Sequence, residues 1–218
     1  AILFAAERHA GQLRKGTTLP YILHPLETLQ ILTEMQADID LQIAGVLHDT
    51  IEDTATTAEE LAMLFGDDVA ALVNHHSEDK SKSWAERKTT AIIAAKQADE
   101  RIKMLILADK LSNLRAIARD YAAIGDALWE RFNAPKEKQA WYYSKIQDAL
   151  YDMQNYPDTA PVYWEMVGLY KDIFVTYYLN QSATALYQQN AEGDCYVLYK
   201  GDTAWYLYEH DVPGNVAQ

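Results

Sequence analysis

The 218-residue sequence has a single cysteine, Cys195, and little glycine or proline, with nine and six residues respectively. One cysteine excludes an internal disulfide and a cysteine-rich zinc site. Every long apolar stretch is broken by charged residues or glutamine, so none is long enough to cross a bilayer. The first residues also lack the basic lead and cleavage pattern of a secretory signal. We therefore expect a soluble protein of the reducing cytoplasm without a membrane segment.

Basic residues are scarce as well, with 19 lysines and arginines against 32 aspartates and glutamates, which gives a formal net charge of −13. Such a chain lacks the positive field of a nucleic-acid binder, so we expect no nucleic-acid partner. A small anionic substrate is not excluded, because a few local cations can override the overall charge. The hydrophobic fraction of 49% excludes a disordered chain.

Apolar residues recur mostly at helical spacing up to about residue 155, which predicts a mainly α-helical fold. Asp38 or Asp40 is expected to cap a helix that continues through His48 to about Asp53. Thr56 or Thr57 is expected to start the next helix, which ends at Gly66. The remaining expected helices are Ile2–Leu13, Pro25–Met35, Asp67–His76, Trp84–Gln97, Asp99–Asp120, Ile124–Phe132 and Pro135–Asn155.

The C-terminal part changes character, so we divide the chain into a helical domain over residues 1–155 and an extension over residues 156–218. A long, aromatic-rich helix is expected over Ala160–Leu179. Three short runs rich in tyrosine, valine and leucine follow, separated by Gly and Asp turn signals. They predict a small three-stranded antiparallel meander over Thr184–Gln189, Cys195–Tyr199 and Ala204–Glu209.

Ionisable residues gather on one predicted helix whose other positions are apolar. His48-Asp49 is followed four residues later by Glu52-Asp53, and residues four apart share a helix face. A buried group of this kind must be neutralised, hydrogen-bonded or bound to a cation. Carboxylates near a helix C-terminus also oppose the helix dipole, which argues against a purely solvated role for Glu52 and Asp53.

Two further polar residues lie in apolar surroundings. Asp109 follows the run Met104–Ala108, with Asn113 four residues later, and His24 stands between Leu23 and Pro25. Together, His24, His48, Asp49 and Asp109 form a set of two imidazoles and two carboxylates, which suits Mn²⁺, Fe²⁺ or Zn²⁺. An ion held by four protein ligands keeps positions open for water and substrate, as hydrolysis requires.

Structural roles are the alternative for each of these residues. His24 before a proline can serve as a hydrogen-bonding residue, and Asp109 can pair with Lys110 or Arg115. His75 and His76 point about 100° apart on a helix, so both cannot easily bind one ion. We therefore interpret His75 and His76 as surface or helix-end residues.

Short motifs follow one another along residues 9–115. They are His9-Ala10-Gly11-Gln12, Arg14-Lys15-Gly16, Pro20-Tyr21-Ile22-Leu23-His24-Pro25, Leu47-His48-Asp49-Thr50-Ile51-Glu52-Asp53-Thr54, Phe65-Gly66, Glu78-Asp79-Lys80, Glu86-Arg87-Lys88 and Leu107-Ala108-Asp109-Lys110-Leu111-Ser112-Asn113-Leu114-Arg115. Their order resembles the alarmone-hydrolase branch of the HD superfamily, a stand-alone relative of the hydrolase domain of RelA/SpoT-type enzymes. The resemblance covers about residues 1–150 and implies an HD-domain helical bundle.

The resemblance implies a role for each matching residue. The metal ligands would be His24, His48, Asp49 and Asp109, usually holding Mn²⁺. Glu52 and Asp53 would orient or activate the attacking water. The nucleotide would be contacted by Arg14, Lys15, Lys110, Asn113 and Arg115, with Arg14 stacking on the base. The implied reaction is hydrolysis of the 3′-pyrophosphate of (p)ppGpp. Ala116 stands where many relatives have a polar residue that can contact the base, so (p)ppApp is a further candidate substrate.

Two other functions remain open from the sequence. One is a different HD phosphohydrolase, a nucleotidase or an NADPH phosphatase. The other is a non-catalytic alarmone sensor or antitoxin-like protein, against which the intact Glu52-Asp53 pair argues. The extension after residue 155 is expected to serve a homo-oligomer contact, a protein partner or the core itself.

Overall fold

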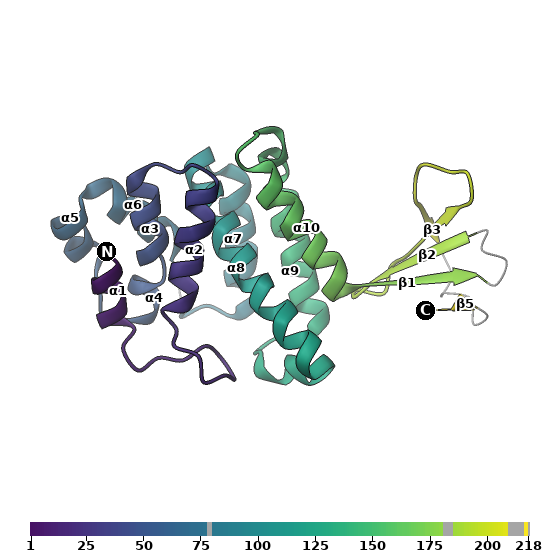
Figure 1. The fold of residues 1–218 in the computed structure, drawn as a ribbon, viewed down its shortest axis with the longest axis horizontal. Coiled ribbons are helices and arrows are strands. Elements are labelled where there is room, and N and C mark those ends of the chain that lie inside the picture. Colours follow the sequence, from purple (N-terminus) through teal and green to yellow (C-terminus); the bar gives the residue numbers. More distant parts are fainter. Residues whose placement is uncertain (78–79, 181–184, 209–215, 218) are drawn as a thin grey trace.

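A computed structural model describes residues 1–77, 80–180, 185–208 and 216–217. The chain forms a body of packed helices followed by a small sheet that stands apart at the C-terminal end (Figure 1). The helices are α1 (Ile2–Arg8), α2 (Leu23–Glu34), α3 (Ile39–Leu47), α4 (Thr50–Asp53), α5 (Ala58–Phe65), α6 (Asp67–His76), α7 (Trp84–Gln97), α8 (Glu100–Ile124), α9 (Lys136–Ala149) and α10 (Ala160–Phe174), with 3₁₀ helices η1 (Gly125–Arg131) and η2 (Tyr151–Asn155). The expectation of a mainly α-helical fold is confirmed.

The expected helices α6 and α7 have the predicted bounds, but the predicted helix through His48 to Asp53 is wrong in one respect. It is broken after Leu47, and a short helix starts at Thr50. His48 and Asp49 occupy the break, so their side chains are not confined to one helix face. The break therefore lets both residues contribute to the same site.

The long helix α8 lies at the centre of the hydrophobic core. Its residues Leu105, Leu107, Leu111 and Leu114 are fully buried, and α2, α3, α6 and α10 pack around it. Gly45 allows α3 to approach α2, because a Cβ atom there would collide with the Leu32 side chain. This close approach brings the start of α2 near the end of α3.

Charged groups join the helix ends outside the core. Asp38 caps α3 by accepting a hydrogen bond from the Leu41 backbone. Arg101 at the start of α8 donates to both Asp38 and Asp68, at 2.8 and 2.7 Å. These bonds lower the pKa of Asp38 and of Asp68, and so favour both carboxylates in the folded state.

The predicted helix over Ala160–Leu179 is also too long, because α10 ends at Phe174 and strand β1 (Val175–Asn180) follows directly. Valine, threonine and tyrosine favour an extended strand at this point. The predicted meander is confirmed as β2 (Ala185–Asn190), β3 (Cys195–Tyr199) and β4 (Tyr206–Tyr208), whereas β1 and β5 (Val216–Ala217) are additional strands. The sheet order is β4-β3-β2-β1-β5, all antiparallel. Of the predicted meander, Thr184 and Glu209 lie outside the described residues.

The extension is tied to the helical body through α10. Val162, Tyr163 and Met166 are buried in the same core as α8, whereas Ala185, Tyr187, Cys195 and Val197 form a separate buried cluster in the sheet. The division of the chain at residue 155 stays a prediction, although α10 completes the helical core.

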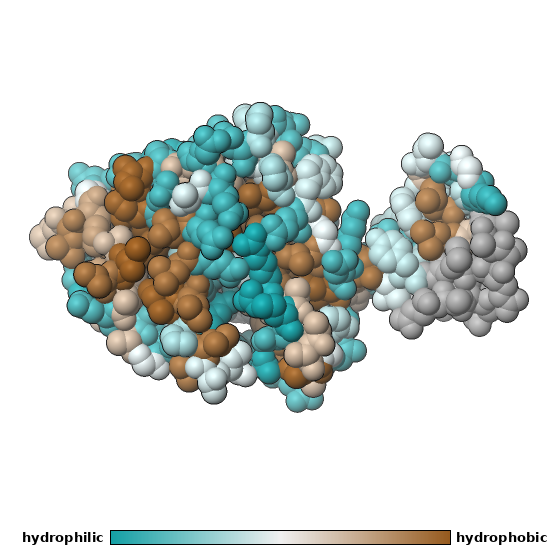
Figure 2. All heavy atoms as spheres, in the orientation of Figure 1, coloured by the Kyte–Doolittle hydropathy of each residue, from teal (hydrophilic) through white to brown (hydrophobic). Residues whose placement is uncertain are grey.

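Apolar side chains also reach the surface at the opposite end of the body. Figure 2 shows them over the region of α1, α3 and α5, where Leu3, Ile39 and Met63 are exposed. Within the described residues, no helix is long and apolar enough to cross a membrane.

Candidate active site

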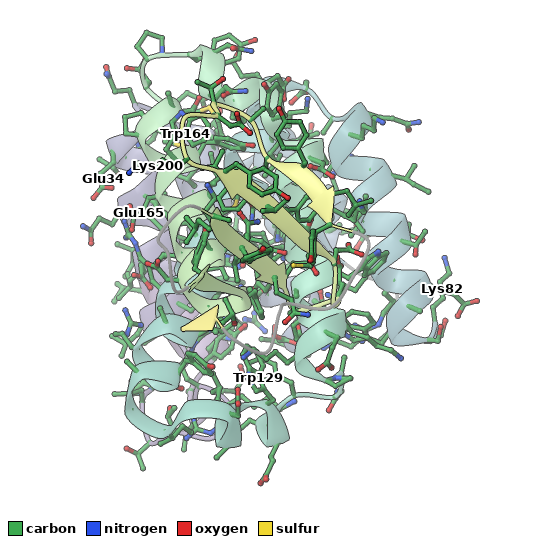
Figure 3. The ribbon with its side chains drawn as sticks, turned by 90° about the vertical axis from the view of Figure 1, so that its right-hand side faces the viewer. Glu34, Lys82, Trp129, Trp164, Glu165 and Lys200 are labelled. Carbon is green, nitrogen blue, oxygen red and sulfur yellow. The ribbon has the colours of Figure 1, made fainter. Side chains whose placement is uncertain are left out.

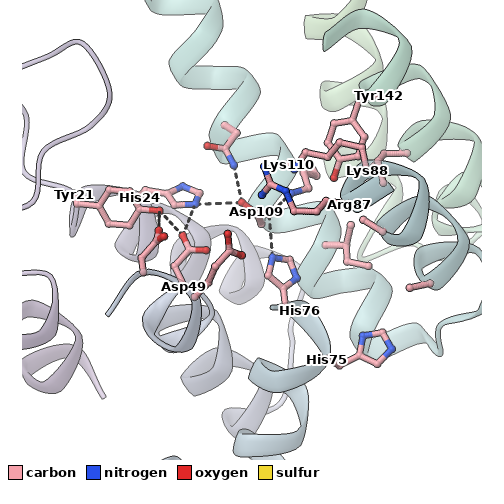
Figure 4. A pocket seen from close by; sticks show the side chains of 17 residues that line it. Tyr21, His24, Asp49, His75, His76, Arg87, Lys88, Asp109, Lys110 and Tyr142 are labelled. Atoms are coloured by element: carbon pink, nitrogen blue, oxygen red, sulfur yellow. Dashed lines mark hydrogen bonds and ion pairs between the residues drawn. The ribbon is translucent and has the colours of Figure 1, made fainter. Parts of the chain in front are cut away.

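The four predicted metal ligands, His24, His48, Asp49 and Asp109, meet in one cluster. Figure 4 shows His24, Asp49 and Asp109 of this cluster. His24 lies in the first turn of α2, His48 and Asp49 lie in the break between α3 and α4, and Asp109 lies in the middle of α8. Segments far apart in the sequence therefore contribute one side chain or two each.

The imidazole nitrogen and carboxylate oxygen atoms of the cluster lie within a few ångströms of one another. His24 Nε2 is 3.2 Å from His48 Nε2, 3.2 Å from Asp109 Oδ1 and 3.5 Å from Asp49 Oδ2. His48 Nε2 is 3.0 Å from Asp49 Oδ2. Ligands bound about 2.1 Å from a common ion and at right angles to one another lie about 3 Å apart. The spacing therefore fits a shared divalent cation.

Hydrogen bonds orient both imidazole rings toward the centre of this cluster. His48 Nδ1 donates to the Gly45 carbonyl oxygen at 2.8 Å, so Nε2 carries the lone pair of the neutral ring. His24 Nδ1 lies 2.8 Å from the Ser112 hydroxyl and likewise leaves Nε2 facing inward. Two facing imidazole nitrogens cannot hydrogen-bond when both are unprotonated. Either a proton on one ring or a cation between the rings and the carboxylates resolves this arrangement, and two imidazoles with two carboxylates are donors that fit a divalent metal ion.

The electrostatics of the cluster favour positive charge. Burial lowers the pKa of His48, but the charges of Asp49 and Asp109 outweigh burial and raise the pKa to about 9. Burial prevails at His24 and lowers its pKa. Burial also opposes the charged forms of Asp49 and Asp109, yet the adjacent cationic groups hold the pKa of each carboxyl below its usual range. Both carboxylates thus remain available as ligands.

His76 is the last residue of α6, so its interpretation as a helix-end residue is right, but its side chain faces the cluster and is not a surface group. Its Nε2 lies 3.1 Å from Asp109 Oδ2, and its ring packs against His48. His76, His48 and Asp109 form a second group of atoms close enough to hold an ion. His75, the preceding residue, is exposed, as expected. The sequence carried no signal that separated the two histidines, because it does not show which side of α6 faces Asp109.

The predicted acidic pair lies at the edge of the cluster. Asp53 accepts hydrogen bonds from Lys80 Nζ at 2.5 Å and from the Tyr21 hydroxyl at 3.3 Å. Lys80 Nζ also lies 3.7 Å from Glu52 Oε1. Burial lowers the pKa of Lys80, but Asp53 and Glu52 together raise it above its usual value. Both carboxylates therefore face a fixed positive charge.

The structure adds Tyr21 to the site, a residue that the sequence analysis placed in a motif without a role. Its hydroxyl donates to Asp49 Oδ2 at 2.6 Å. Burial and the neighbouring carboxylates raise the pKa of Tyr21, so its hydroxyl remains protonated as a donor. Tyr21 thus connects a predicted metal ligand with the predicted acidic pair.

A chain of polar contacts leads outward from Asp109. Lys110 Nζ donates to Asp109 Oδ2 at 2.6 Å, and Asn113 Nδ2 donates to Asp109 Oδ1 at 2.7 Å. Arg14 in turn donates to Asn113 Oδ1 at 3.1 Å. Burial opposes the charge of Lys110, but Asp109 more than offsets this and raises the pKa of Lys110 well above its usual value.

Two cavities meet at the cluster, and Tyr21, His24 and Asn113 line both. The first, shown in Figure 4, contains most of the ionisable groups of the site. Its cationic lining residues are Arg87, Lys88 and Lys110, and its acidic ones are Asp49, Glu52, Asp53 and Asp109. The second cavity combines three cations, Arg14, Lys15 and Arg119, and the acidic residues Glu27 and Asp120 with an apolar wall. That wall includes Ala116, Ile117, Leu128, Phe132 and Tyr143. The cluster therefore separates a charged compartment from a more apolar one.

Arg115 is the predicted substrate contact that the structure does not bring to these cavities. It lines neither of them and instead donates to Glu165 of α10 at 2.7 and 2.8 Å. Lys15 lies at the exposed edge of the second cavity, 3.3 Å from Asn133. Of the motif Glu78-Asp79-Lys80, Glu78 and Asp79 lie outside the described residues. Arg87 and Lys88, which line the first cavity, belong to a motif to which the sequence analysis assigned no role.

Comparisons with known proteins agree with this geometry. The HD domain family matches residues 1–136. The guanosine-3′,5′-bis(diphosphate) 3′-pyrophosphohydrolase MESH1 of Xenopus tropicalis is 42% identical over 119 residues, which cover 53% of this chain and 66% of that protein. The chain thus matches just under two thirds of the length of this curated relative.

Two solved structures are similar as well. The protein lmo0812 of Listeria monocytogenes EGD-e has a TM-score of 0.64 and 34% identity, with 69% of this chain and 97% of that chain covered. A metazoan ortholog of SpoT, described as hydrolysing ppGpp, has a TM-score of 0.64 and 29% identity, with coverage of 78% and 92%. The family match spans more than half of the chain and includes the whole histidine and aspartate cluster. The chain belongs to the HD domain family.

Proposed function

We propose that this chain is a metal-dependent hydrolase that removes the 3′-pyrophosphate of a nucleotide alarmone, (p)ppGpp or (p)ppApp, and releases pyrophosphate. The observation that carries this proposal is the histidine and aspartate cluster at the junction of two cavities, one lined by cations and carboxylates and the other more apolar. A nucleotide with a phosphorylated 3′ position has matching halves, one charged and one flat and apolar. The names of the relatives point to the same substrate class.

We propose Mn²⁺ as the native ion, held by His24, His48, Asp49 and Asp109. Mixed imidazole and carboxylate donors suit Mn²⁺, Fe²⁺ or Zn²⁺ better than a thiolate-preferring metal. When bound, such an ion acidifies a water molecule and offsets negative charge on the phosphate oxygens. His76 lies beside Asp109 on the side of the charged cavity, where its imidazole can donate to a substrate oxygen.

The charged cavity is the proposed compartment for the pyrophosphate. Arg87, Lys88 and Lys110 supply positive charge there, on the side of the cluster away from the apolar cavity. Lys110 is held in place by Asp109, so its charge is already oriented before a substrate binds. Fixed cations of this kind stabilise the charge that develops as a phosphate ester is cleaved.

The apolar cavity is the proposed compartment for the base and ribose. The Arg14 guanidinium is positioned by Asn113 at the boundary between the cavities, where it can stack on a base. Phe132 and Tyr143 add aromatic surface, and Ala116 and Ile117 offer no polar side-chain atom to a base. This apolar wall is the reason to include an adenine alarmone beside a guanine one. We leave Arg115 out of the proposed nucleotide contacts, because Glu165 engages its guanidinium.

Glu52 and Asp53 are the proposed groups for orienting and deprotonating the attacking water. Asp53 already accepts hydrogen bonds from Lys80 and Tyr21, which fix its carboxylate. Glu52 lines the charged cavity and its carboxylate lies farther from Lys80, at 3.7 Å. We therefore assign the general base to Glu52 and the orienting role to Asp53.

The wider setting is also a proposal. We propose that the catalytic part lies within residues 1–155, that the protein works in the cytoplasm, and that the sheet after α10 serves contacts with another copy or a partner protein. The acidic composition and the lone cysteine support the cytoplasmic location. The separate cluster of buried residues in the sheet supports a contact role for the sheet.

The decisive experiment measures pyrophosphate release from ppGpp and from ppApp, with Mn²⁺ or with a chelator. The test variant is Asp49→Asn, and Asp158→Asn is the matched control because Asp158 lies far along the chain in an exposed turn. We expect metal-dependent release that is lost in Asp49→Asn and kept in Asp158→Asn. Release of single phosphate from NADPH or a mononucleotide would instead indicate another phosphohydrolase, and binding without turnover would indicate a sensor.

A further inference from the structure

His24 is fixed on its outer side by two polar residues that the proposed reaction does not use. Its Nδ1 atom lies 2.8 Å from the Ser112 hydroxyl oxygen. The same hydroxyl donates to Glu27 Oε2, also at 2.8 Å. His24 and Ser112 are both almost completely buried, so solvent does not compete for these bonds.

The chemistry of the three groups determines where the protons are. An ionised carboxylate can only accept hydrogen bonds, so the single proton of the Ser112 hydroxyl points to Glu27. The hydroxyl oxygen must then accept from His24, which places the imidazole proton on Nδ1. Nε2 is left with its lone pair toward Asp49 and Asp109.

The second histidine of the cluster needs no such support from a side chain. His48 Nδ1 donates to a backbone carbonyl oxygen, that of Gly45, which substitution of a side chain does not remove. The orientation of His24 therefore depends on Ser112 and Glu27, whereas that of His48 depends on the helix backbone.

Glu27 is itself held from the outside. Arg115 and Arg119 of α8 face its carboxylate, with closest distances of 3.6 and 3.8 Å. Arg115 is anchored in turn by two hydrogen bonds to Glu165 of α10. Figure 3 shows Glu165 on the flank of the body that also carries Glu34 of α2. This gives Arg115 a place in the molecule other than substrate contact.

From these contacts we infer that Ser112 and Glu27 are positioning residues that hold His24 as an Nε2 ligand, and that Arg115 holds Glu27. The inference rests on the metal-dependent function proposed above. A ligating histidine donates a hydrogen bond from its other ring N–H, and the group that accepts this bond fixes the tautomer and the ring orientation. Removal of that group typically lowers metal affinity about 10- to 100-fold. Ser112 accepts the hydrogen bond from His24, and Glu27 accepts the hydrogen bond from Ser112.

The test is the affinity of the metal-free full chain for Mn²⁺ alone, measured by calorimetric titration. We expect Ser112→Ala and Glu27→Gln each to weaken binding, by about 10-fold or more. Glu34→Gln is the matched control, because it makes the same chemical change on the same helix at an exposed site. Its affinity should equal that of the wild type. Urea unfolding without metal checks that each variant is folded.

The double variant Ser112→Ala/Glu27→Gln tests whether Glu27 acts on His24 through Ser112 or independently of it. If Glu27 acts through Ser112, the double variant binds Mn²⁺ no more weakly than Ser112→Ala alone, whereas independent effects multiply. Nitrogen NMR of metal-free protein gives a readout that packing damage does not move. We expect His24 protonated on Nδ1 in the wild type and a mixture of tautomers in Glu27→Gln. Should Ser112→Ala fail to fold, Glu27→Gln alone decides the matter by these two measurements.

Unchanged affinity and tautomer in the variants would overturn the inference, as would effects that multiply. These outcomes leave the proposed reaction untouched, since no substrate is present. Wild-type protein that binds no Mn²⁺ would instead overturn the metal-dependent function itself.

Discussion

Replacing Tyr21 with phenylalanine tests whether the proposed metal ligands and the proposed acidic pair work as one unit. The substitution removes one hydroxyl, which donates to Asp49 at 2.6 Å and more distantly to Asp53 at 3.3 Å. The ring remains, and with it the packing against His9 and His24. The change is therefore confined to two hydrogen bonds with carboxylates.

The expected magnitude follows from the shorter bond. A hydrogen bond to a charged group contributes about 1.5 to 3 kcal/mol, and each 1.4 kcal/mol corresponds to about a factor of ten. The 3.3 Å bond to Asp53 adds little, because hydrogen bonds weaken at this length. We therefore expect Tyr21→Phe to lower kcat/KM for pyrophosphate release about 10- to 100-fold, together with weaker binding of Mn²⁺.

The assay is the initial rate of pyrophosphate release over a range of Mn²⁺ and substrate concentrations. Tyr163→Phe is the matched control, since Tyr163 is a buried tyrosine of α10 whose hydroxyl donates to the Gln147 carbonyl oxygen at 3.4 Å. A kcat/KM for Tyr21→Phe within about threefold of the wild type would refute the reasoning, because the hydroxyl would then contribute less than about 1 kcal/mol.

Three further predictions concern stability and the extension. Asp152→Asn removes the charge that pairs with the buried Lys103 at 2.7 Å and should cost about 1 to 2 kcal/mol in urea unfolding; an unchanged midpoint would contradict this. Arg101→Gln should cost about 1 kcal/mol or less at pH 7, because its partners are exposed. Arg101 lowers the pKa of Asp38 and of Asp68, so this contribution is present above about pH 4 and is lost as the pH falls through the lowered pKa values. The difference between wild type and variant should therefore shrink in acid. A chain ending at Phe174 should retain pyrophosphate release, since the sheet has its own buried cluster; loss of release with the helices intact by circular dichroism would contradict it.

Local patterns allowed much of the helical fold to be predicted. The expected helix Trp84–Gln97 has the bounds of α7, which begins with a capping box of Ser83 and Glu86, and the expected helix from Asp99 matches α8, which Asp99 caps. The ends of helices and strands were harder to predict where tertiary packing determines them. The stretch after Phe174 continues the aromatic pattern of α10, and only its pairing with β2 shows that it is a strand.

The cluster of histidines and aspartates could be predicted because its residues are chemically unusual in their sequence surroundings. Asp109 in an apolar helix and the acidic pair after His48 require partners, and the structure supplies them. His76 could not be assigned in the same way, because the sequence does not reveal which side of α6 faces Asp109. Tyr21 has no unusual neighbour in sequence, and its role depends on contacts across the fold.

Arg115 illustrates a different limit. Its place in a motif after Asp109 and Asn113 suggested contact with a nucleotide, but its side chain points to Glu165 and Glu27. Sequence spacing along α8 gives the helix face of a residue, while the partner on that face comes from α10, about fifty residues later. Which ion pairs form is therefore decided by packing and not by the motif.

The break between α3 and α4 has a consequence for how the protein unfolds. The imidazoles and carboxylates that meet there with α2 and α8 are separated by up to more than eighty residues of chain, so an unfolded molecule cannot gather them. An ion that binds only the native state shifts the folding equilibrium by mass action, by about 2.7 kcal/mol when its free concentration is a hundred times its Kd. The melting temperature of this protein should therefore rise with the logarithm of the ion concentration, which makes thermal unfolding a direct report on occupancy of the site.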